Sequence, residues 1–367
     1  MEFTVELTQT PIPDAERERL LLDPGFGRLH TDHMVTVRWS ARQGWCDARL
    51  GPYGPLSFDP ATSFLHYGQT IFEGFKAYRH PDGSVAMFRP DANARRFALS
   101  AERLTLPALP VEIFLAAADL LVATDRAWVP GAADTSLYLR PFLLGTEVGL
   151  GVRPSNEALF VLTAHPAGSY FSGGVKPVRI WLSTDYVRAA PGGTGEAKCG
   201  GNYAASLAAQ EQAIAEGCDQ VVFLDAETRT WIEELGGMNL FFVQADGSLV
   251  TPALTGTILR GITRESLLTL CGDLGIRVTE RRVPADEWRA GVQSGQITEV
   301  FACGTAAVIS PIGALVTPDG EFSTGPGVGP VTTRLRQALT DVQYGHAPDG
   351  HGWLRRVPSP AMAAPSC

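Results

Sequence analysis

Short apolar runs typical of strands alternate with two amphipathic stretches in the first half of the chain. The runs expected to form strands cover residues 34–39, 84–88, 136–144 and 158–163. The amphipathic stretches at 92–103 and 111–127 repeat their apolar positions with a helical period. This mixture predicts an α/β or α+β domain.

The second half has more strand-like runs and fewer helical stretches. Helices are expected at 203–216, where Gly217 ends the pattern, and at 258–271. Many strands with few helices favour a barrel-like sheet over a doubly wound one. Strands are expected at 178–184, 221–224, 230–235, 240–243 and 299–303, with a hairpin turn at Ala245, Asp246 and Gly247.

Length and composition indicate two domains. A chain of 367 residues, 45% of them hydrophobic, has enough apolar side chains for two cores. Gly, Pro and Ser gather at 166–177, as is typical of an interdomain connection. We therefore expect one domain at 1–170, a linker at 171–177 and a second domain at 178–367.

Charge and cysteine placement narrow the class of function. The net charge of -9 is scattered along the chain, which disfavours a nucleic-acid or membrane partner because both need a basic face. The most apolar long stretch, 111–129, is interrupted by charges, and the acidic N-terminal segment lacks the apolar core of a signal peptide. The six cysteines are dispersed, with no CxxC pair and no Cys/His cluster for a metal. These features predict a cytoplasmic protein that acts on small molecules.

One lysine, Lys198, lies in the glycine-rich segment PGGTGEAKCGGNYAAS. Glycines let a backbone approach a bulky ligand closely. A lysine held away from water is a nucleophile that can form an imine with an aldehyde cofactor. Lysines in loops are more often solvated, so this assignment depends on what the rest of the chain supplies.

A phosphate site is the first such feature. The segment LTGTILRG runs into an expected helix, so the amides of Thr257 and Ile258 are expected at a helix N-terminus that could bind an anion. The same pattern is common as a plain helix cap. Either Arg95 or Arg96 could add a bidentate guanidinium, and their positions alone do not choose between them.

A carboxylate and a carboxylate-binding turn are the other features. Glu233 and Glu234 follow one another on an expected strand, so only one of them can enter a site beside a cofactor ring. The small residues of GTAA at 304–307 could present backbone amides to a substrate carboxylate. Four aromatic residues could line an apolar pocket, although aromatics at such positions are more often plain core: Tyr67, Phe72, Tyr138 and Tyr170.

Separate stretches spread over nearly the whole chain agree with one family. The chain closely resembles the branched-chain amino acid aminotransferases, which are fold type IV (class IV) pyridoxal phosphate enzymes. The matching stretches are TDHMVTVRW, LHYGQTIFEGFKAYR, FRPDANARRF, SLYLRP, GLGVRP, GTGEAKCGGNYAAS, EELGGMNLFF, TGTILRGITRESLL, FACGTAAVISPI and LRQALTDVQYGHAPDGHGW.

The resemblance implies how the cofactor, pyridoxal 5′-phosphate, is held. Lys198 would form the Schiff base and carry a proton between the substrate Cα and cofactor C4′. In the RPxxNxxR spacing the phosphate arginine is Arg96, and Arg95 is left to solvent. The remaining implied contacts are Tyr203 on the ring O3′, Glu234 rather than Glu233 on the pyridine nitrogen, and Thr257, Ile258 and Thr305 on the phosphate.

The resemblance also implies a substrate site and a homodimer. The amides of Thr305 and Ala306, with Tyr138, would bind the α-carboxylate, and Arg140 would help with the second carboxylate of glutamate. The implied pocket for the side chain is lined by Phe26, Tyr67, Phe72 and Tyr170, and Leu150 and Val152 would reach the partner subunit's pocket. The implied fold is a small α/β domain followed by a larger pseudo-barrel domain.

The expected reaction is a ping-pong transamination of leucine, isoleucine or valine with 2-oxoglutarate. Relatives with other substrates are the alternatives: a transaminase of specialised β-branched or aromatic amino acids, a D-amino acid transaminase and an aminodeoxychorismate lyase. The YLR segment at 138–140 and the GTAA turn favour the branched-chain reading over the last two.

Overall fold

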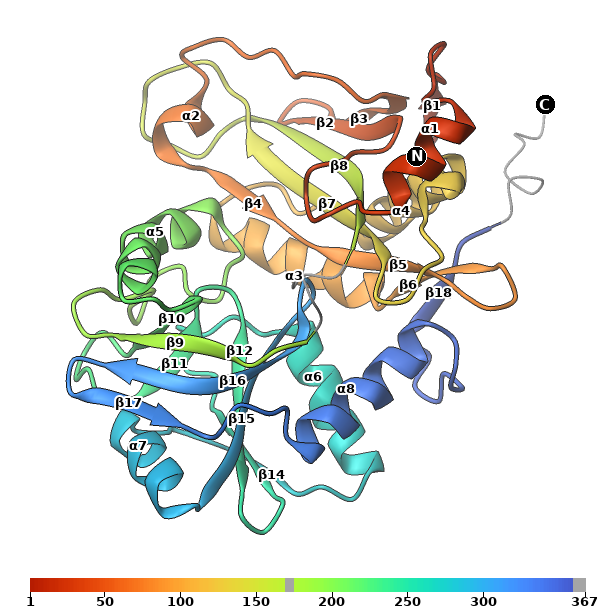
Figure 1. Ribbon diagram of the computed structural model, residues 1–367. Helices are drawn as coiled ribbons and strands as arrows, with labels where there is room; N and C mark the ends of the chain where they lie inside the picture. The colour runs from red at the N-terminus through yellow and green to blue at the C-terminus, as the bar shows by residue number, and fades with distance from the viewer. Residues whose placement is uncertain (169–174, 359–367) are drawn as a thin grey trace. The chain divides into compact units, whose positions relative to one another are not determined.

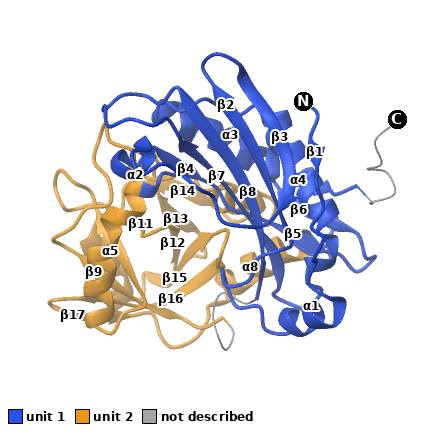
Figure 2. Ribbon diagram, turned by 90° about the horizontal axis from the view of Figure 1, so that it is seen from above, with its two compact units in different colours: residues 1–170, 197–200, 342–367 blue, residues 171–196, 201–341 orange. Residues whose placement is uncertain are grey.

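The chain forms two compact units in the computed structural model, which describes residues 1–168 and 175–358. The first unit comprises Met1–Tyr170, Ala197–Gly200 and Val342–Cys367, and the second comprises Phe171–Glu196 and Gly201–Asp341 (Figure 2). The domain boundaries expected from the sequence stay a prediction. The units differ from them in two segments, because 197–200 and the residues from 342 onward belong with the first unit. Most of the expected linker lies outside the described residues.

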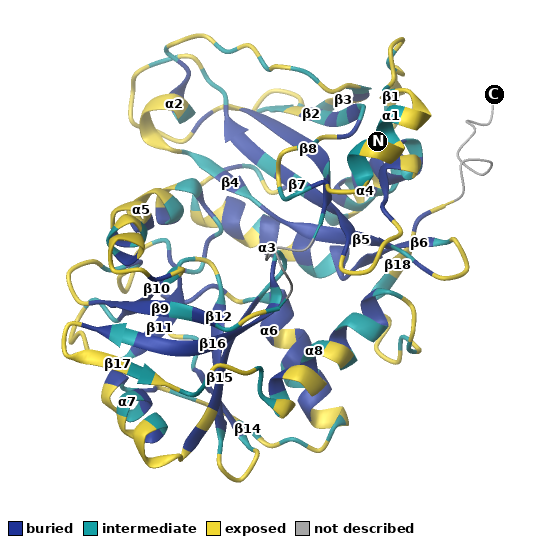
Figure 3. Ribbon diagram, viewed as in Figure 1, coloured by how far each residue is buried: buried dark blue, intermediate teal, exposed yellow. Residues whose placement is uncertain are grey.

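The first unit is built on a mixed but mainly antiparallel sheet. Its strands follow the order β1-β3-β2-β8-β7-β5-β6-β18, with β4 also paired to β7. The long central pair β7 and β8 is almost wholly buried (Figure 3), since side chains on both faces are covered. The strands are β1 (Thr4–Val5), β2 (His33–Ser40), β3 (Gly44–Pro52), β4 (Thr70–Phe72), β5 (Phe75–Arg79), β6 (Val85–Phe88), β7 (Ser136–Gly145), β8 (Glu157–Ala167) and β18 (Leu354–Arg356).

Two helices of the first unit pack on this sheet and contribute buried side chains to its core. Phe97 of α3 and Phe114 of α4 are buried and lie edge-on or tilted against Phe160 of β8. Pro90 at the first turn of α3 suits a helix start, where a missing N–H costs nothing. The helices are α1 (Asp14–Leu21), α2 (Ser63–Tyr67), α3 (Pro90–Arg103), α4 (Val111–Thr124) and the 3-10 turn η1 (Arg126–Trp128).

The second unit is built on a sheet that curls. Its order is β11-β10-β9-β16-β15-β12-β13-β14, with β17 paired to β16. Strand β11 at one end also contacts β12 and β13 near the other end, which is the closure expected of a barrel-like sheet. The strands are β9 (Val178–Ser183), β10 (Gln220–Leu224), β11 (Ile232–Leu235), β12 (Asn239–Gln244), β13 (Leu249–Pro252), β14 (Val278–Arg281), β15 (Ile297–Gly304), β16 (Val308–Thr317) and β17 (Gly320–Ser323).

Helices of the second unit surround this sheet (Figure 1). On one side Trp288 of α7 is buried edge-on against Phe242 of β12. On α5, Ala209 and Ala213 are buried and Leu207 and Ile214 are exposed. The helices are α5 (Gly200–Ala215), α6 (Ile262–Asp273), α7 (Ala285–Ser294) and α8 (Pro330–Gln343).

One expected element is wrong at its start. The helix expected from residue 258 begins at Ile262, so Thr257 and Ile258 lie in the preceding loop and not at a helix N-terminus. The reason is that this loop is held by side chains of other segments: Thr257 O accepts from Arg188, Leu259 N–H donates to Glu234, and Leu259 O accepts from Asn239. These bonds replace the helical ones.

Candidate active site

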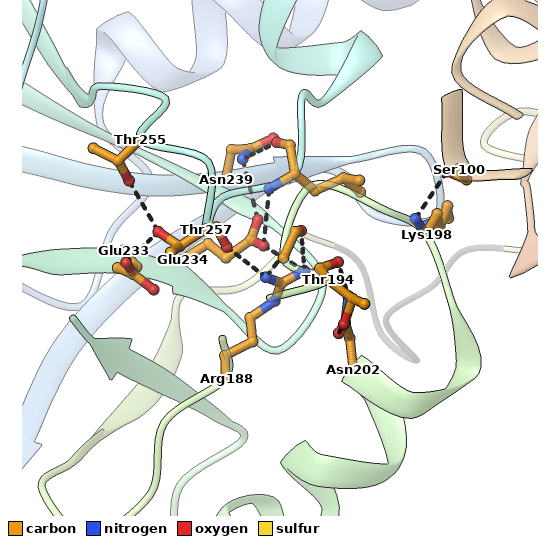
Figure 4. Close-up of polar contacts among 12 residues, drawn as sticks. Ser100, Arg188, Thr194, Lys198, Asn202, Glu233, Glu234, Asn239, Thr255 and Thr257 are labelled. Carbon is orange, nitrogen blue, oxygen red and sulfur yellow. Dashed lines mark hydrogen bonds and ion pairs between the residues drawn. The ribbon is translucent and has the colours of Figure 1, made fainter. Parts of the chain in front are cut away.

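Lys198 is fixed at its backbone by the first unit. Its N–H donates to Ser100 Oγ at 3.0 Å (Figure 4), and its carbonyl accepts the N–H of Phe72 at 2.9 Å. The adjacent Cys199 forms a β-bridge with Ile71 and is buried. The Lys198 Nζ lies 4.9 Å from the centroid of the Phe72 ring. These contacts therefore hold the backbone of Lys198 in one place.

A buried ion pair lies beside this lysine. Arg96 donates from Nε and Nη2 to the two oxygens of Glu73, at 2.6 and 2.9 Å. Glu73 is 0% exposed and also accepts from Asn93 Nδ2 at 2.7 Å. Burial alone would raise the pKa of Glu73, but the charge and hydrogen bonds of Arg96, with the charge of Lys198, hold that pKa below its usual value. Arg95 instead lies at the surface and pairs with Asp91.

Three of the aromatic residues predicted for the substrate pocket lie close to Arg140. The Arg140 guanidinium lies over the rings of Phe72 and Tyr138, 5.0 and 5.3 Å from their centroids, and donates to the Tyr138 hydroxyl at 3.2 Å. Phe26 lies edge-on to Tyr138 at 5.2 Å. A Cβ at Gly74 would come within 1.8 Å of the Tyr138 hydroxyl oxygen, so this close approach requires glycine.

Other predicted substrate residues lie at the surface of the first unit or outside its described part. Tyr67 is 42% exposed and its hydroxyl donates to the carbonyl of Leu150. Leu150 and Val152 are 63% and 82% exposed. Tyr170 lies outside the described residues.

In the second unit, Glu234 is held by a buried arginine. Arg188 Nη2 lies 2.7 Å from Glu234 Oε1, and each of these side chains is 2% exposed. Asn239 Nδ2 and the Leu259 amide donate to the same carboxylate, both at 3.2 Å (Figure 4). A carboxylate with a cationic partner and two further donors is stabilised as the anion.

Arg188 also joins two backbone segments of the second unit. It donates to the carbonyl of Thr257 at 2.9 Å and to that of Gly195 at 3.4 Å. A Cβ at Gly195 would lie 2.4 Å from Thr257 O, so the two segments can touch only because residue 195 is glycine. The glycine-rich segment and the loop of Thr257 thus form one packed structure.

Glu233 points to a different set of partners, as strand alternation requires. Glu233 accepts a hydrogen bond from the hydroxyl of Thr257. The same hydroxyl oxygen lies 2.9 Å from the hydroxyl oxygen of Thr255. Burial raises the pKa of Glu233, although the hydrogen bond from Thr257 opposes this. The Thr257 hydroxyl is therefore engaged by Glu233.

The remaining predicted residues occupy loops and helix α5 of the second unit. Thr305 and Ala306 lie in the tight turn between β15 and β16, where Gly304 pairs with Val308. Ile258 is buried. Tyr203 lies on α5 beside Gly237, where a Cβ would be 3.5 Å from the tyrosine ring.

Sequence reasoning missed the residues that hold the predicted ones. Asn93 and Ser100 lie on the same helix face as the predicted Arg96, and this spacing could have been read from the expected helix at 92–103. Glu73 could have been noticed as a charge in an otherwise apolar stretch. Nothing local distinguishes Arg188, because its partners come from distant segments.

Comparisons with known proteins give the class. Residues 70–315 match the sequence model of the family described as Amino-transferase class IV. The chain therefore belongs to the class IV amino-transferases.

Full-length relatives give the family within that class. The chain is 58% identical over 358 residues to a probable branched-chain-amino-acid aminotransferase of Streptomyces coelicolor, covering 96% of this chain and 99% of the relative. It is 54% identical over 362 residues to the branched-chain-amino-acid aminotransferase of Mycobacterium tuberculosis strain H37Rv, covering 97% and 98%. Within class IV, this similarity places it in the branched-chain-amino-acid aminotransferase family.

Solved structures agree on the fold. The Escherichia coli branched-chain amino acid aminotransferase matches with a TM-score of 0.74 and 29% identity, over 88% of this chain and 99% of that chain. The T.th. branched-chain amino acid aminotransferase, solved with pyridoxamine 5′-phosphate, matches with a TM-score of 0.73 and 30% identity, over 88% and 98%. The expected fold type IV architecture and family are confirmed.

Two findings concern the residues that the structure describes. No helix in the described ranges is both long and apolar enough to span a membrane. No group of three or more His, Cys, Asp or Glu side chains within those ranges is arranged to hold a metal ion.

Proposed function

We propose that the chain catalyses ping-pong transamination between the branched-chain amino acids leucine, isoleucine and valine and 2-oxoglutarate. The products are the branched-chain 2-oxo acids and glutamate. The observation that carries the proposal is Lys198, whose backbone is fixed on both sides by Ser100 and Phe72. A lysine held in this way, on a chain of this family, is the imine-forming group.

The groups present fit pyridoxal 5′-phosphate, the cofactor of this family. The cofactor needs an amine for its aldehyde, a cation for its phosphate and an anion for its ring nitrogen. Lys198, Arg96 and Glu234 supply these three kinds of group, and both Arg96 and Glu234 are buried. When bound, the cofactor supplies an aldehyde for imine formation and a ring that withdraws electrons from the substrate Cα.

We assign the chain's own residues as follows. Lys198 Nζ takes the proton from Cα of the amino acid and delivers it to C4′ of the cofactor. Glu234, kept anionic by Arg188, holds the proton on the ring nitrogen. The other assigned groups are Tyr203 for the ring hydroxyl, and Arg96, Ile258, Thr305 and the amide of Thr257 for the phosphate.

The substrate is assigned to the aromatic cluster. Phe26, Phe72 and Tyr138 offer apolar surface for a branched side chain, and Tyr67 and Tyr170 are assigned to the same pocket. Arg140 lies against Phe72 and Tyr138, so it supplies the charge for the second carboxylate of glutamate. Thr305 and Ala306 provide backbone amides for the α-carboxylate.

Borohydride reduction tests the lysine directly. The lysines of the sequence are Lys76, Lys176 and Lys198, so trapping the imine and mapping the labelled peptide has only these possible results. We expect the label on Lys198, and we expect Lys198→Ala to lose the visible cofactor absorbance and turnover. Lys176→Ala is the matched control, since this exposed side chain should affect neither. A label on Lys76 or Lys176, or steady turnover by Lys198→Ala, would refute the assignment.

A panel of amino donors with 2-oxoglutarate tests the substrate. We expect turnover of L-leucine, L-isoleucine and L-valine. Turnover of D-alanine without L-leucine, or release of pyruvate from aminodeoxychorismate, would identify one of the other class IV activities. Higher specificity for an aromatic or unusual β-branched donor would indicate a specialised transaminase.

We further infer a cytoplasmic homodimer with shared active sites. The exposed apolar side chains of Leu150 and Val152 support a contact with a second copy, because burying them would remove that surface from water. Free thiols at Cys46, Cys199, Cys218, Cys271 and Cys303 agree with a reducing compartment. Sedimentation should give a dimer that Val152→Asp weakens, and a wild-type monomer with full activity would contradict this inference.

A further inference from the structure

We infer that Glu73 is a positioning residue that sets Arg96 for the cofactor phosphate. This inference rests on the proposed function, in which Arg96 binds that phosphate. It assigns no contact between Glu73 and the cofactor, since the carboxylate acts through the guanidinium.

The geometry of the pair supports this role. Glu73 receives the Nε and Nη2 edge of Arg96 in a two-point pairing, which fixes the plane of the guanidinium as well as its position. The pairing therefore fixes the orientation in which the guanidinium would meet a phosphate. An arginine side chain otherwise loses much rotamer entropy when it binds an anion, and this pairing removes that cost beforehand.

Glu73 itself is fixed. Its Oε2 accepts from Asn93 Nδ2 at 2.7 Å and from the Gly74 amide at 3.1 Å, in addition to Arg96. Asn93 also donates to the carbonyl of Gly74 at 3.2 Å. The carboxylate is completely buried, so it cannot turn to solvent without disrupting the end of β4 and the start of β5.

The same helix face also holds the lysine. Asn93, Arg96 and Ser100 lie along one side of α3; the first two bind Glu73, and Ser100 binds the backbone of Lys198. Arg96, assigned to the phosphate, and Lys198, assigned to the imine, are therefore both held in position by one helix, α3. The alternative role for Glu73 is only to neutralise a buried arginine. In that case, replacing Glu73 should weaken the binding of cofactors with and without a phosphate equally.

Comparison of two aldehydes separates the two roles. Cofactor-free protein is titrated with pyridoxal 5′-phosphate and with pyridoxal, which lacks the phosphate, and imine formation is followed by visible absorbance. We expect Glu73→Gln to weaken pyridoxal 5′-phosphate binding about 10- to 100-fold, the range for losing a charge-assisted hydrogen-bonded partner. Pyridoxal binding should stay within about twofold of wild type, a change near the limit of such measurements. Arg95→Gln, at the adjacent exposed position, should change neither.

A double variant and a milder variant keep the test usable if Glu73→Gln does not fold. Glu73→Gln/Arg96→Gln carries neither buried charge, and its dissociation constant for pyridoxal 5′-phosphate should equal that of Arg96→Gln alone. Asn93→Ala keeps both charges and should weaken only the phosphorylated aldehyde, by about threefold or more.

The outcomes distinguish failure of this inference from failure of the proposed function. Equal weakening of both aldehydes, or additive losses in the double variant, would overturn the role of Glu73. An unchanged preference for the phosphorylated aldehyde in Glu73→Gln would do the same. Wild-type protein that bound neither aldehyde would instead overturn the proposed function.

Discussion

Replacing Arg188 by methionine should destabilise the second unit strongly. The change removes the 2.7 Å ion pair with Glu234, a buried carboxylate that also accepts from Asn239 and the Leu259 amide. Breaking one side of a buried ion pair costs about 3–5 kcal/mol, because the remaining charge is uncompensated. The carbonyl of Thr257 also loses its 2.9 Å donor, at a further cost of about 1–3 kcal/mol.

Urea unfolding of the cofactor-free protein, followed by tryptophan fluorescence and circular dichroism, measures this loss. Omitting the cofactor keeps its own binding energy out of the comparison. The control is Arg277→Met, because Arg277 pairs with Asp246 at the same 2.7 Å but the side chains are 73% and 56% exposed. That variant should lose little stability, because solvent screens an exposed ion pair.

A double variant identifies the cause. In Arg188→Met/Glu234→Gln the orphaned charge is gone, so we expect about 1–3 kcal/mol less destabilisation than the sum of the single changes. Arg188→Met as stable as Arg277→Met, or strictly additive losses, would refute the reasoning that the buried charge governs this region.

Two further predictions concern the same unit. Gly195→Ala should weaken cofactor binding and lower the melting temperature, since its Cβ would lie 2.4 Å from Thr257 O. Gly201→Ala is the control, because a Cβ there would have nothing within 4 Å, and it should be neutral or slightly stabilising. Equal melting temperatures for the two variants would contradict the close packing at Gly195. Against the effect of burial, the backbone amides of Trp231, Thr228 and Thr230 lower the pKa of Asp225 to about 2. A depressed carboxyl pKa stabilises the fold above the unfolded value of about 4, so the advantage of wild type over Asp225→Asn should be present at neutral pH and vanish as the pH falls from about 4 to 2. Free energies of unfolding of both proteins, measured across that pH range, test this direction. A stability advantage of wild type that grew on acidification would contradict the prediction.

Strands and helices with a clear period were predictable from the sequence. The expected strand at 136–144 is β7, and the expected helix at 92–103 is α3, which begins two residues earlier at Pro90. These two predictions are correct because the apolar residues of a buried strand, or of a helix with one buried face, form a pattern within the element itself. The start of α6 was wrong because Arg188, Glu234 and Asn239, all distant in sequence, hold the loop before it.

In the candidate site, too, some features could be predicted from local sequence and others depend on distant segments. Lys198 was visible in the sequence as one lysine among glycines, and family resemblance then chose Arg96 over Arg95 and Glu234 over Glu233. The structure shows why such choices are hard from pattern alone: both glutamates are buried, and what separates them is their partners, Thr257 for one and Arg188 for the other. Glu73 and Arg188 act on predicted residues from other segments, and no local pattern reports such contacts.

The pairing of β18 with β6 has a consequence for synthesis on the ribosome. Residues 354–356 complete the sheet edge at 86–88, so that edge stays unpaired until strands β7 to β17 have all been made. Trp353, which packs on Phe88 and lies 5.4 Å from the Arg89 guanidinium, arrives equally late. An unpaired edge next to an apolar face is a template for association between nascent chains. The first sheet to emerge is thus the last to be finished, and ribosome stalling just before residue 353 should yield chains that depend on chaperones.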